Sequence, residues 1–111
     1  EILEPKIEFW IAEKKFCRPE LTIKIVAKEI GTNYNYLSAH LNKNLGINFQ
    51  AWLNTLRVEE GKSLLLSEPH LSIEEIATMV GFTQNYNFSK WFKIVIGTTP
   101  FQYRKQNLVR R

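Results

Sequence analysis

Apolar residues recur along this chain at intervals of three and four positions, which is the spacing of one face of an α-helix. Leu37, Leu41 and Leu45 show the pattern most simply, at i, i+4 and i+8. The pattern predicts an all-α fold of about seven helices. The predicted helices cover residues 7–16, 22–30, 33–44, 48–66, 72–80 and 84–95, with a last one from 100 onward.

Short polar residues stand where the predicted helices begin. Thr22, Asn33 and Asn48 each precede an apolar stretch, and their side chains can accept a hydrogen bond from an amide of the first turn. Ser72 and Glu75 have the spacing of a capping box, in which a hydroxyl and a carboxylate each satisfy a backbone amide. The helix boundaries are therefore predicted from both periodicity and capping.

The same pattern occurs twice. Ala27 and Gly31 match Ala77 and Gly81 at an offset of 50 residues, and after one inserted residue the offset becomes 51. The alanine lets a second helix cross closely over the first, and the glycine tolerates the positive φ of a tight turn. Two copies of helix, glycine turn and helix are typical of the helix-turn-helix, whose second helix enters the major groove of DNA.

Charge is divided unevenly along the chain. Residues 1–75 hold nine Lys and Arg and all eleven acidic residues, a net charge of −2. Residues 76–111 hold six Lys and Arg and no acid, a net charge of +6. This asymmetry indicates a polyanionic partner for the C-terminal third.

The repeat and its flanks resemble the signature of the AraC/XylS-type transcription regulators, from about Leu21 to Arg104. The resemblance implies two helix-turn-helix subdomains, over residues 1–47 and 67–111, joined by a long linker helix over 48–66. It also implies that two recognition helices enter successive major-groove segments. It further implies that the domain lies at the C-terminus of a longer regulator, which also has a sensing or dimerisation domain. The matching motifs are Ile76-Ala77-x-x-Val80-Gly81-Phe82, Phe88-Ser89-Lys90-x-Phe92-Lys93 and Gly97-Thr98-Thr99-Pro100-x-x-Tyr103-Arg104.

The resemblance, carried over position by position, gives candidate DNA contacts. Asn and Gln side chains can bind adenine through two hydrogen bonds, and Lys can donate to guanine. Arg and Lys elsewhere suit phosphate, as do backbone amides at helix N-termini. The candidates for base contact are Tyr34, Asn35, Ser38, Ala39, Asn42, Gln84, Asn85, Tyr86, Ser89 and Lys90, and those for phosphate contact are Arg57, Lys62, Lys93, Arg104 and Lys105.

Two positions depart from the family pattern. Ala39 stands where many members have a basic or long polar side chain, and Asn87 stands where an aromatic residue is frequent. The first recognition helix therefore carries little charge, with Lys43 near its end. We expect the second unit to supply most of the electrostatic affinity and the first to contribute shape and amide contacts.

Other classes of function find less support in the residues. No nucleophile, base and orienting group converge, so we expect no enzyme activity and no cofactor. Cys17 is the single cysteine, and His40 and His70 lack partners at metal-ligand spacing, so no metal site is predicted. No apolar run is long enough to span a bilayer, and the cysteine content favours the cytoplasm. Double-stranded DNA is the expected partner, and RNA polymerase is a further one. The alternative function is that of a helical protein-interaction module that does not bind DNA.

Overall fold

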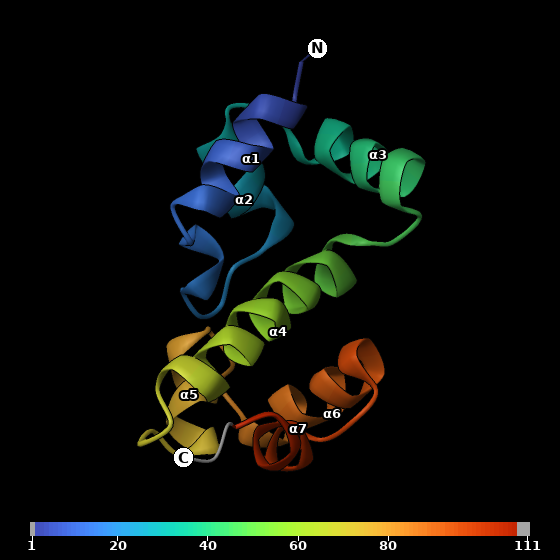
Figure 1. Ribbon diagram of the computed structural model, residues 1–111. Helices are drawn as coiled ribbons and strands as arrows, with labels where there is room; N and C mark the ends of the chain where they lie inside the picture. Colours follow the sequence, from blue (N-terminus) through green and yellow to red (C-terminus); the bar gives the residue numbers. More distant parts are fainter. Residues whose placement is uncertain (1, 109–111) are drawn as a thin grey trace.

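Helices make up nearly all of the chain in the computed structural model, which describes residues 2–108 (Figure 1). The all-α fold and the helix-turn-helix pairs predicted above are confirmed, and the described residues form seven α-helices. The elements are α1 (Glu4–Ala12), the 3₁₀ helix η1 (Lys15–Cys17), α2 (Ile23–Ile30), α3 (Tyr34–Leu45), α4 (Phe49–Ser67), α5 (Ile73–Met79), α6 (Asn85–Ile96) and α7 (Pro100–Asn107).

The predicted caps start the helices at the expected positions. The side chains of Thr22, Asn33, Asn48 and Ser72 each accept a hydrogen bond from the amide three residues further on, at 2.8–3.2 Å. The capping box is complete, because the Ser72 amide also donates to a carboxylate oxygen of Glu75 at 2.8 Å. Local sequence alone therefore fixes the beginnings of α2, α3, α4 and α5.

The N-terminal segment differs from the single helix predicted over 7–16. Pro5 lies in the first turn of α1, where a proline needs no amide partner, and this allows the helix to begin at Glu4. The helix ends at Ala12 because Lys14 adopts a left-handed φ of 56° and turns the chain into η1. Phe16 is thereby buried against Trp10, with ring centroids 6.4 Å apart.

Two hydrophobic cores lie along α4. Trp52 and Leu53, near its start, belong to a core formed with α1, η1, α2 and α3. Val58 and Leu65, further along, belong to a second core formed with α5 and α6. One helix thus connects both helix-turn-helix pairs (Figure 1).

The glycine turns have the predicted conformation. Gly31 and Gly81 have φ values of 95° and 111°, where a side chain would be strained. The alanines ahead of them, Ala27 and Ala77, are almost fully buried where the second helix of each pair crosses the first. The two turns also share a hydrogen bond, from the amide one residue after the glycine to the alanine carbonyl.

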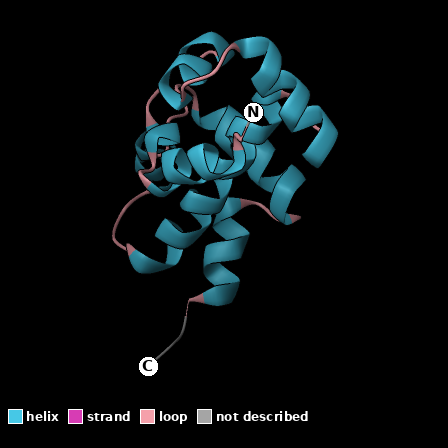
Figure 2. Ribbon diagram, turned by 90° about the horizontal axis from the view of Figure 1, so that it is seen from above, coloured by secondary structure: helices cyan, strands magenta, loops and turns pink. Residues whose placement is uncertain are grey.

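The molecule is elongated, with extents of 50 × 25 × 22 Å. Seen along its length in Figure 2, the helices gather into a bundle. Within residues 2–108, no helix is both long and apolar enough to cross a bilayer.

Candidate nucleic-acid interface

The second helix of each pair, α3 and α6, lies in the right-hand part of Figure 1, with α3 above α4 and α6 below it. Each is twelve residues long and is anchored by two buried side chains, Leu37 and Leu41 in α3 and Phe88 and Phe92 in α6. These anchors correspond at an offset of 51 residues. The faces opposite the anchors are therefore presented in the same way by both units.

The outer face of α3 is polar and uncharged. Asn35, Ala39 and Asn42 are exposed, and Ser38 is half-buried. Tyr34 is 44% exposed, but its ring lies under the Lys24 ammonium at 5.2 Å from the ring centroid. The Tyr34 hydroxyl can hydrogen-bond a base, whereas the cation occupies one face of the ring.

The outer face of α6 combines positive charge with apolar surface. Tyr86 is 71% exposed, Lys90 and Lys93 are exposed, and Ser89 is half-buried. Ile94 is 61% exposed beside them, and together with Thr99 they surround a shallow depression. Sequence reasoning missed Ile94, although its position four residues after Lys90 already placed it on the same side of the helix.

Gln84 and Asn85 lie at the start of α6 and are exposed. Gln84 is the residue before the helix, not its first residue, and its side chain makes no capping hydrogen bond in the described structure. At the start of α3, by contrast, the Asn33 side chain accepts a hydrogen bond from the backbone amide of Tyr36. The first-turn amides of α6 therefore have no such side-chain acceptor.

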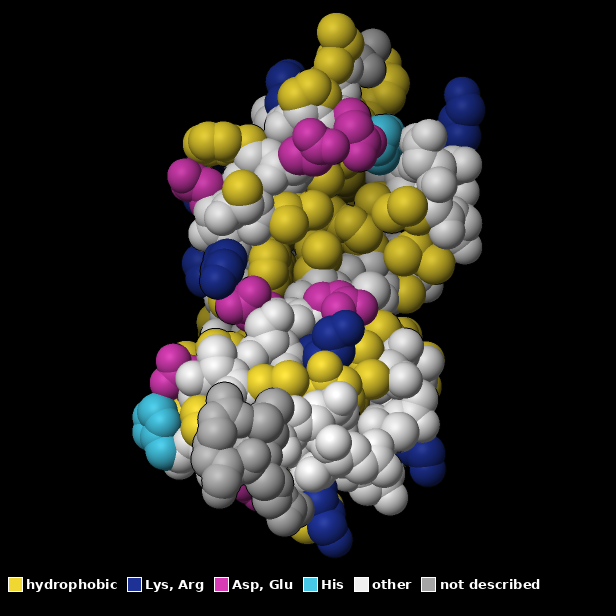
Figure 3. All heavy atoms as spheres, viewed as in Figure 1, with side chains coloured by type: hydrophobic (Ala, Val, Ile, Leu, Met, Phe, Trp, Pro, Cys, Tyr) yellow, Lys and Arg dark blue, Asp and Glu magenta, His cyan; other side chains and the backbone are white. Residues whose placement is uncertain are grey.

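The charge of the two faces follows the division along the sequence. Between Ala77 and Leu108, Lys and Arg occur and acidic residues do not. Figure 3 shows the acidic side chains grouped on the front of the molecule, around an apolar hollow and near its middle. Lysine or arginine side chains stand at the right-hand margin of this view, on the side of α3 and α6, and others stand at its left margin and near the middle.

Arg57, expected to contact phosphate, has a different role in the structure. It is 5% exposed, and its Nε and one terminal nitrogen donate to the carbonyls of Phe16 and Arg18, at 2.9 and 2.7 Å. Burial lowers the pKa of the guanidinium, and the two carbonyls compensate for lost hydration. Two of its five N–H donors are therefore used inside the protein, and the side chain has little exposed surface to offer a phosphate.

Arg104, also a candidate for phosphate contact, uses its guanidinium nitrogens for bonds within the protein. Its three guanidinium nitrogens donate to the carbonyls of Leu65, Leu71 and Glu68, at 2.9, 2.7 and 3.1 Å. Arg104 therefore attaches α7 to the end of α4 and to the loop that follows. In each unit, one arginine binds the chain segment that precedes the first helix of the pair.

The remaining phosphate candidates are lysines on the surface. Lys93 and Lys105 are exposed. Lys62 is half-buried and forms an ion pair with Glu59 at 3.2 Å, one helical turn away. A surface pair of this kind is weak, so the Lys62 ammonium can still be drawn to another anion.

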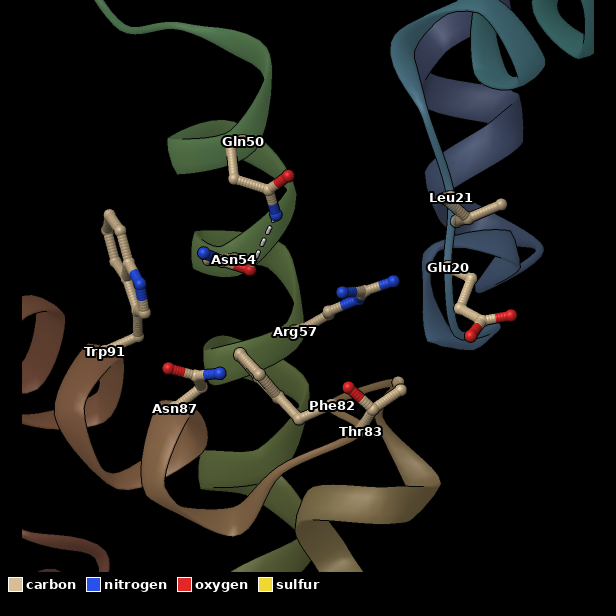
Figure 4. A pocket seen from close by; sticks show the side chains of 10 residues that line it. Glu20, Leu21, Gln50, Asn54, Arg57, Phe82, Thr83, Asn87 and Trp91 are labelled. Atoms are coloured by element: carbon tan, nitrogen blue, oxygen red, sulfur yellow. Dashed lines mark hydrogen bonds between the residues drawn. The ribbon is translucent and has the colours of Figure 1, made fainter.

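A polar cleft of about 360 Å³ separates the middle of α4 from the start of α6 (Figure 4). Asn54 is buried in its wall, and its Oδ1 accepts a hydrogen bond from Gln50 at 3.3 Å. Asn87 and Trp91 face α4 across the cleft. Trp91 is half-buried, so it belongs to the side of α6 that faces the linker helix.

The described residues include no group of three or more His, Cys, Asp or Glu side chains that could hold a metal ion. His40 instead lies 3.0 Å from a carboxylate oxygen of Glu4, and this contact joins α3 to α1.

Known proteins share this architecture. The sequence profile of a helix-turn-helix domain family matches residues 26–106. The HTH-type transcriptional regulator YtdP of Bacillus subtilis is 34% identical over 87 residues, and the matching region covers 78% of this chain but 11% of that protein. This chain therefore corresponds to a small part of that longer regulator.

Solved structures agree with this match. The C-terminal domain of AraT, a response regulator from Geobacillus stearothermophilus, superposes with a TM-score of 0.80 at 33% identity, covering 100% of this chain and 93% of that one. The DNA-binding domain of the global transcriptional factor AdpA, solved in complex with a target DNA, superposes with a TM-score of 0.77 at 19% identity. It covers 94% of this chain and 90% of that one, and it shares the fold.

Proposed function

Because the chain belongs to the AraC-type helix-turn-helix family of transcription regulators, we propose that it binds double-stranded DNA sequence-specifically, with α3 and α6 in successive major-groove segments. The observation that carries this proposal is the pair of outer faces, equivalent at an offset of 51 residues, on two helices that both lie toward the right-hand margin of Figure 1. The nineteen residues of α4 correspond to a length of about 28 Å at 1.5 Å per residue. This length suits recognition helices placed about 34 Å apart, one turn of DNA.

The two faces favour different bases. In α3, Asn35 and Asn42 offer amides that can bind adenine, whereas the equivalent positions in α6 are Tyr86 and Lys93. Lys90 can donate to guanine, and apolar surface beside it suits the methyl group of thymine. We therefore expect an asymmetric target, with adenine in the half-site of α3 and with guanine and thymine in that of α6. The further base candidates in this assignment are Tyr34, Ser38, Ala39, Gln84, Asn85 and Ser89.

Phosphate contacts, in this proposal, come from Lys62, Lys93 and Lys105 and from the first-turn amides of α6. These phosphate contacts fix the orientation of the domain on the duplex, but they do not distinguish one base sequence from another. Because they concentrate in the second unit, that unit supplies most of the salt-dependent affinity.

The wider role is also a proposal. The relative YtdP is far longer than the matched region, which supports a sensing or dimerisation domain attached to this one. We propose that the regulator acts in the cytoplasm, that the domain has no enzyme activity of its own, and that RNA polymerase is a further partner at the promoter. The division into units at 1–47, 48–66 and 67–111 is supported by the two cores that α4 joins.

Fluorescence anisotropy with a labelled random duplex, at 50 and 200 mM salt, tests the proposal. Contacts to three or four phosphates would weaken binding by about 40–150-fold between these concentrations, since the slope is about 0.9 per phosphate on logarithmic axes. Lys90→Ala should weaken binding more than Asn35→Ala at low salt. Lys6→Ala, which removes the same charge from exposed α1, should leave binding nearly unchanged.

The alternative, a helical module that binds protein and not DNA, predicts a different outcome of the same titration. Undetectable or salt-insensitive binding at micromolar protein would favour it. A larger loss from Asn35→Ala than from Lys90→Ala would keep DNA binding but reverse the roles assigned to the two units.

A further inference from the structure

Arg57 lies at the junction of the two helix-turn-helix units. It leaves α4 between Leu53, which belongs to the first core, and Val58, which belongs to the second. Its guanidinium reaches the first unit by donating to the carbonyls of Phe16 and Arg18, on either side of Cys17. This side chain therefore holds the η1 segment against the middle of α4.

The second unit rests on the same guanidinium. A Cβ atom added to Gly81 would lie 2.7 Å from the Nε of Arg57 and 2.9 Å from the carbonyl oxygen of Cys17. The glycine turn between α5 and α6 is thus packed directly on Arg57 and on η1. The ring centroid of Phe82, the next residue, lies 5.7 Å from the guanidinium carbon, which adds a cation–π contact (Figure 4).

The other attachments of the first unit lie mainly in the first half of α4. Trp52 and Leu53 are buried in the first core and Phe49 and Leu56 pack against it, and the Lys14–Glu60 ion pair, at 2.9 Å, adds one contact further along. An exposed ion pair contributes little. The η1 segment bound to Arg57 is therefore a second attachment of the first unit to α4. Two separate attachments are needed to fix the orientation of the first unit relative to the second.

We propose that Arg57 is a positioning residue that fixes the placement of α3 relative to α6, and thereby the half-site spacing that the domain accepts. The proposal rests on the DNA-binding function proposed above. Arg57 touches no DNA in this arrangement and acts through the η1 segment on one side and the Gly81 turn on the other. Without its hydrogen bonds the units remain folded around their own cores, but their relative orientation varies.

Arg57→Lys is the sharpest variant, because it keeps the positive charge while a single ammonium cannot reproduce the planar fork that binds two carbonyls. Arg57→Met removes the donors altogether. Arg104→Met is the matched control, since Arg104 makes equivalent bonds to carbonyls but only to the end of α4 and the loop that follows, and none to the first unit. Circular dichroism should show unchanged helix content in each variant used.

The binding experiment uses a duplex recovered from a random library with the wild-type domain, together with derivatives that carry one base pair inserted or deleted between the half-sites. The wild type and Arg104→Met should lose about tenfold or more in affinity on insertion, because one recognition helix loses its base contacts. Arg57→Lys and Arg57→Met should lose less than about threefold relative to their own affinity for the parent duplex. An arginine that only stabilised the fold would lower every affinity equally, and an unchanged spacing dependence in Arg57→Lys would overturn the proposal.

A second measurement needs no DNA. Spin labels at Ala39→Cys and Lys90→Cys, in a Cys17→Ser background, report the distance between α3 and α6. The distribution should be narrow with Arg57 and broader with Arg57→Lys, and equal widths would overturn the proposal. If the wild type selects no duplex, the proposed function fails, whereas this distance measurement still decides the role of Arg57.

Discussion

Gly61 allows α6 to pack closely against the linker helix, and Gly61→Ala tests this contact. Gly61 lies inside α4, where glycine is unfavourable for the helix itself. A Cβ atom placed there would be 2.7 Å from Cε1 and 2.8 Å from Cζ of Phe88. Phe88 is fully buried and anchors the second candidate recognition helix.

Two opposing effects determine the outcome. Alanine improves helix propensity by about 1 kcal/mol over glycine in a helix interior. The added carbon needs the Phe88 ring to move by about 0.7 Å to reach the 3.4 Å of ordinary contact. That ring is confined by Phe82 and Phe92, with centroids 5.5 and 5.6 Å away, so overpacking of about 1–3 kcal/mol follows. We expect a net loss of up to about 2 kcal/mol in unfolding free energy.

Urea unfolding followed by circular dichroism measures this change. Ser63→Ala, at an exposed position two residues further along α4, is the control for helix propensity and should not destabilise the domain. The double variant Gly61→Ala/Phe88→Leu should lose at least about 1 kcal/mol less than the sum of the single changes, because the smaller side chain makes room. A Gly61→Ala domain about 1 kcal/mol more stable than the wild type would refute the contact.

Two other predictions concern acid and a buried hydroxyl. The Arg18 hydrogen bond lowers the pKa of Glu29, and bonding to Ser72 lowers that of Glu75, so both carboxylates stabilise the fold above the ordinary value of 4.5 and lose this contribution as the pH falls. Thermal unfolding between pH 7 and 3 should show that the stability of the wild type falls below about pH 4.5, and that it falls less steeply in Glu29→Gln and in Glu75→Gln. A pH dependence in both variants as steep as that of the wild type would contradict this. The Oγ1 of Thr32 is buried without a hydrogen-bond partner in the described structure, so Thr32→Val should stabilise the domain by about 0.5–1 kcal/mol in urea unfolding. Thr83→Val, at an exposed position in the turn before α6, should change the stability little, and a destabilised Thr32→Val would indicate that the hydroxyl has a partner.

The exposed outer faces could be predicted from the sequence because they follow from local geometry. Once Leu37 and Leu41 are assigned to the core, helical periodicity places Asn35 and Asn42 away from it, and the structure exposes both. The same holds for Lys90 opposite Phe88 and Phe92. Which bases these side chains contact stays a prediction.

The roles of the arginines could not be read from residue type. Arginine can donate to phosphates and to backbone carbonyls alike, because both accept from its fork of donors. The spacing did contain a signal, since Arg57 lies four residues after Leu53 and four before Gly61, on the buried side of α4. This spacing signal was outweighed by the general preference of charged residues for the protein surface.

Sequence by itself determined the helices, their caps, the duplicated glycine turn and the separation of charge, because each depends on residues within a few positions of one another or on composition. Tertiary structure alone decided what occupies the space between the units. The carbonyls of Phe16 and Arg18 lie 41 and 39 residues from Arg57 along the chain, and the fold must form before they and Gly81 meet around one guanidinium.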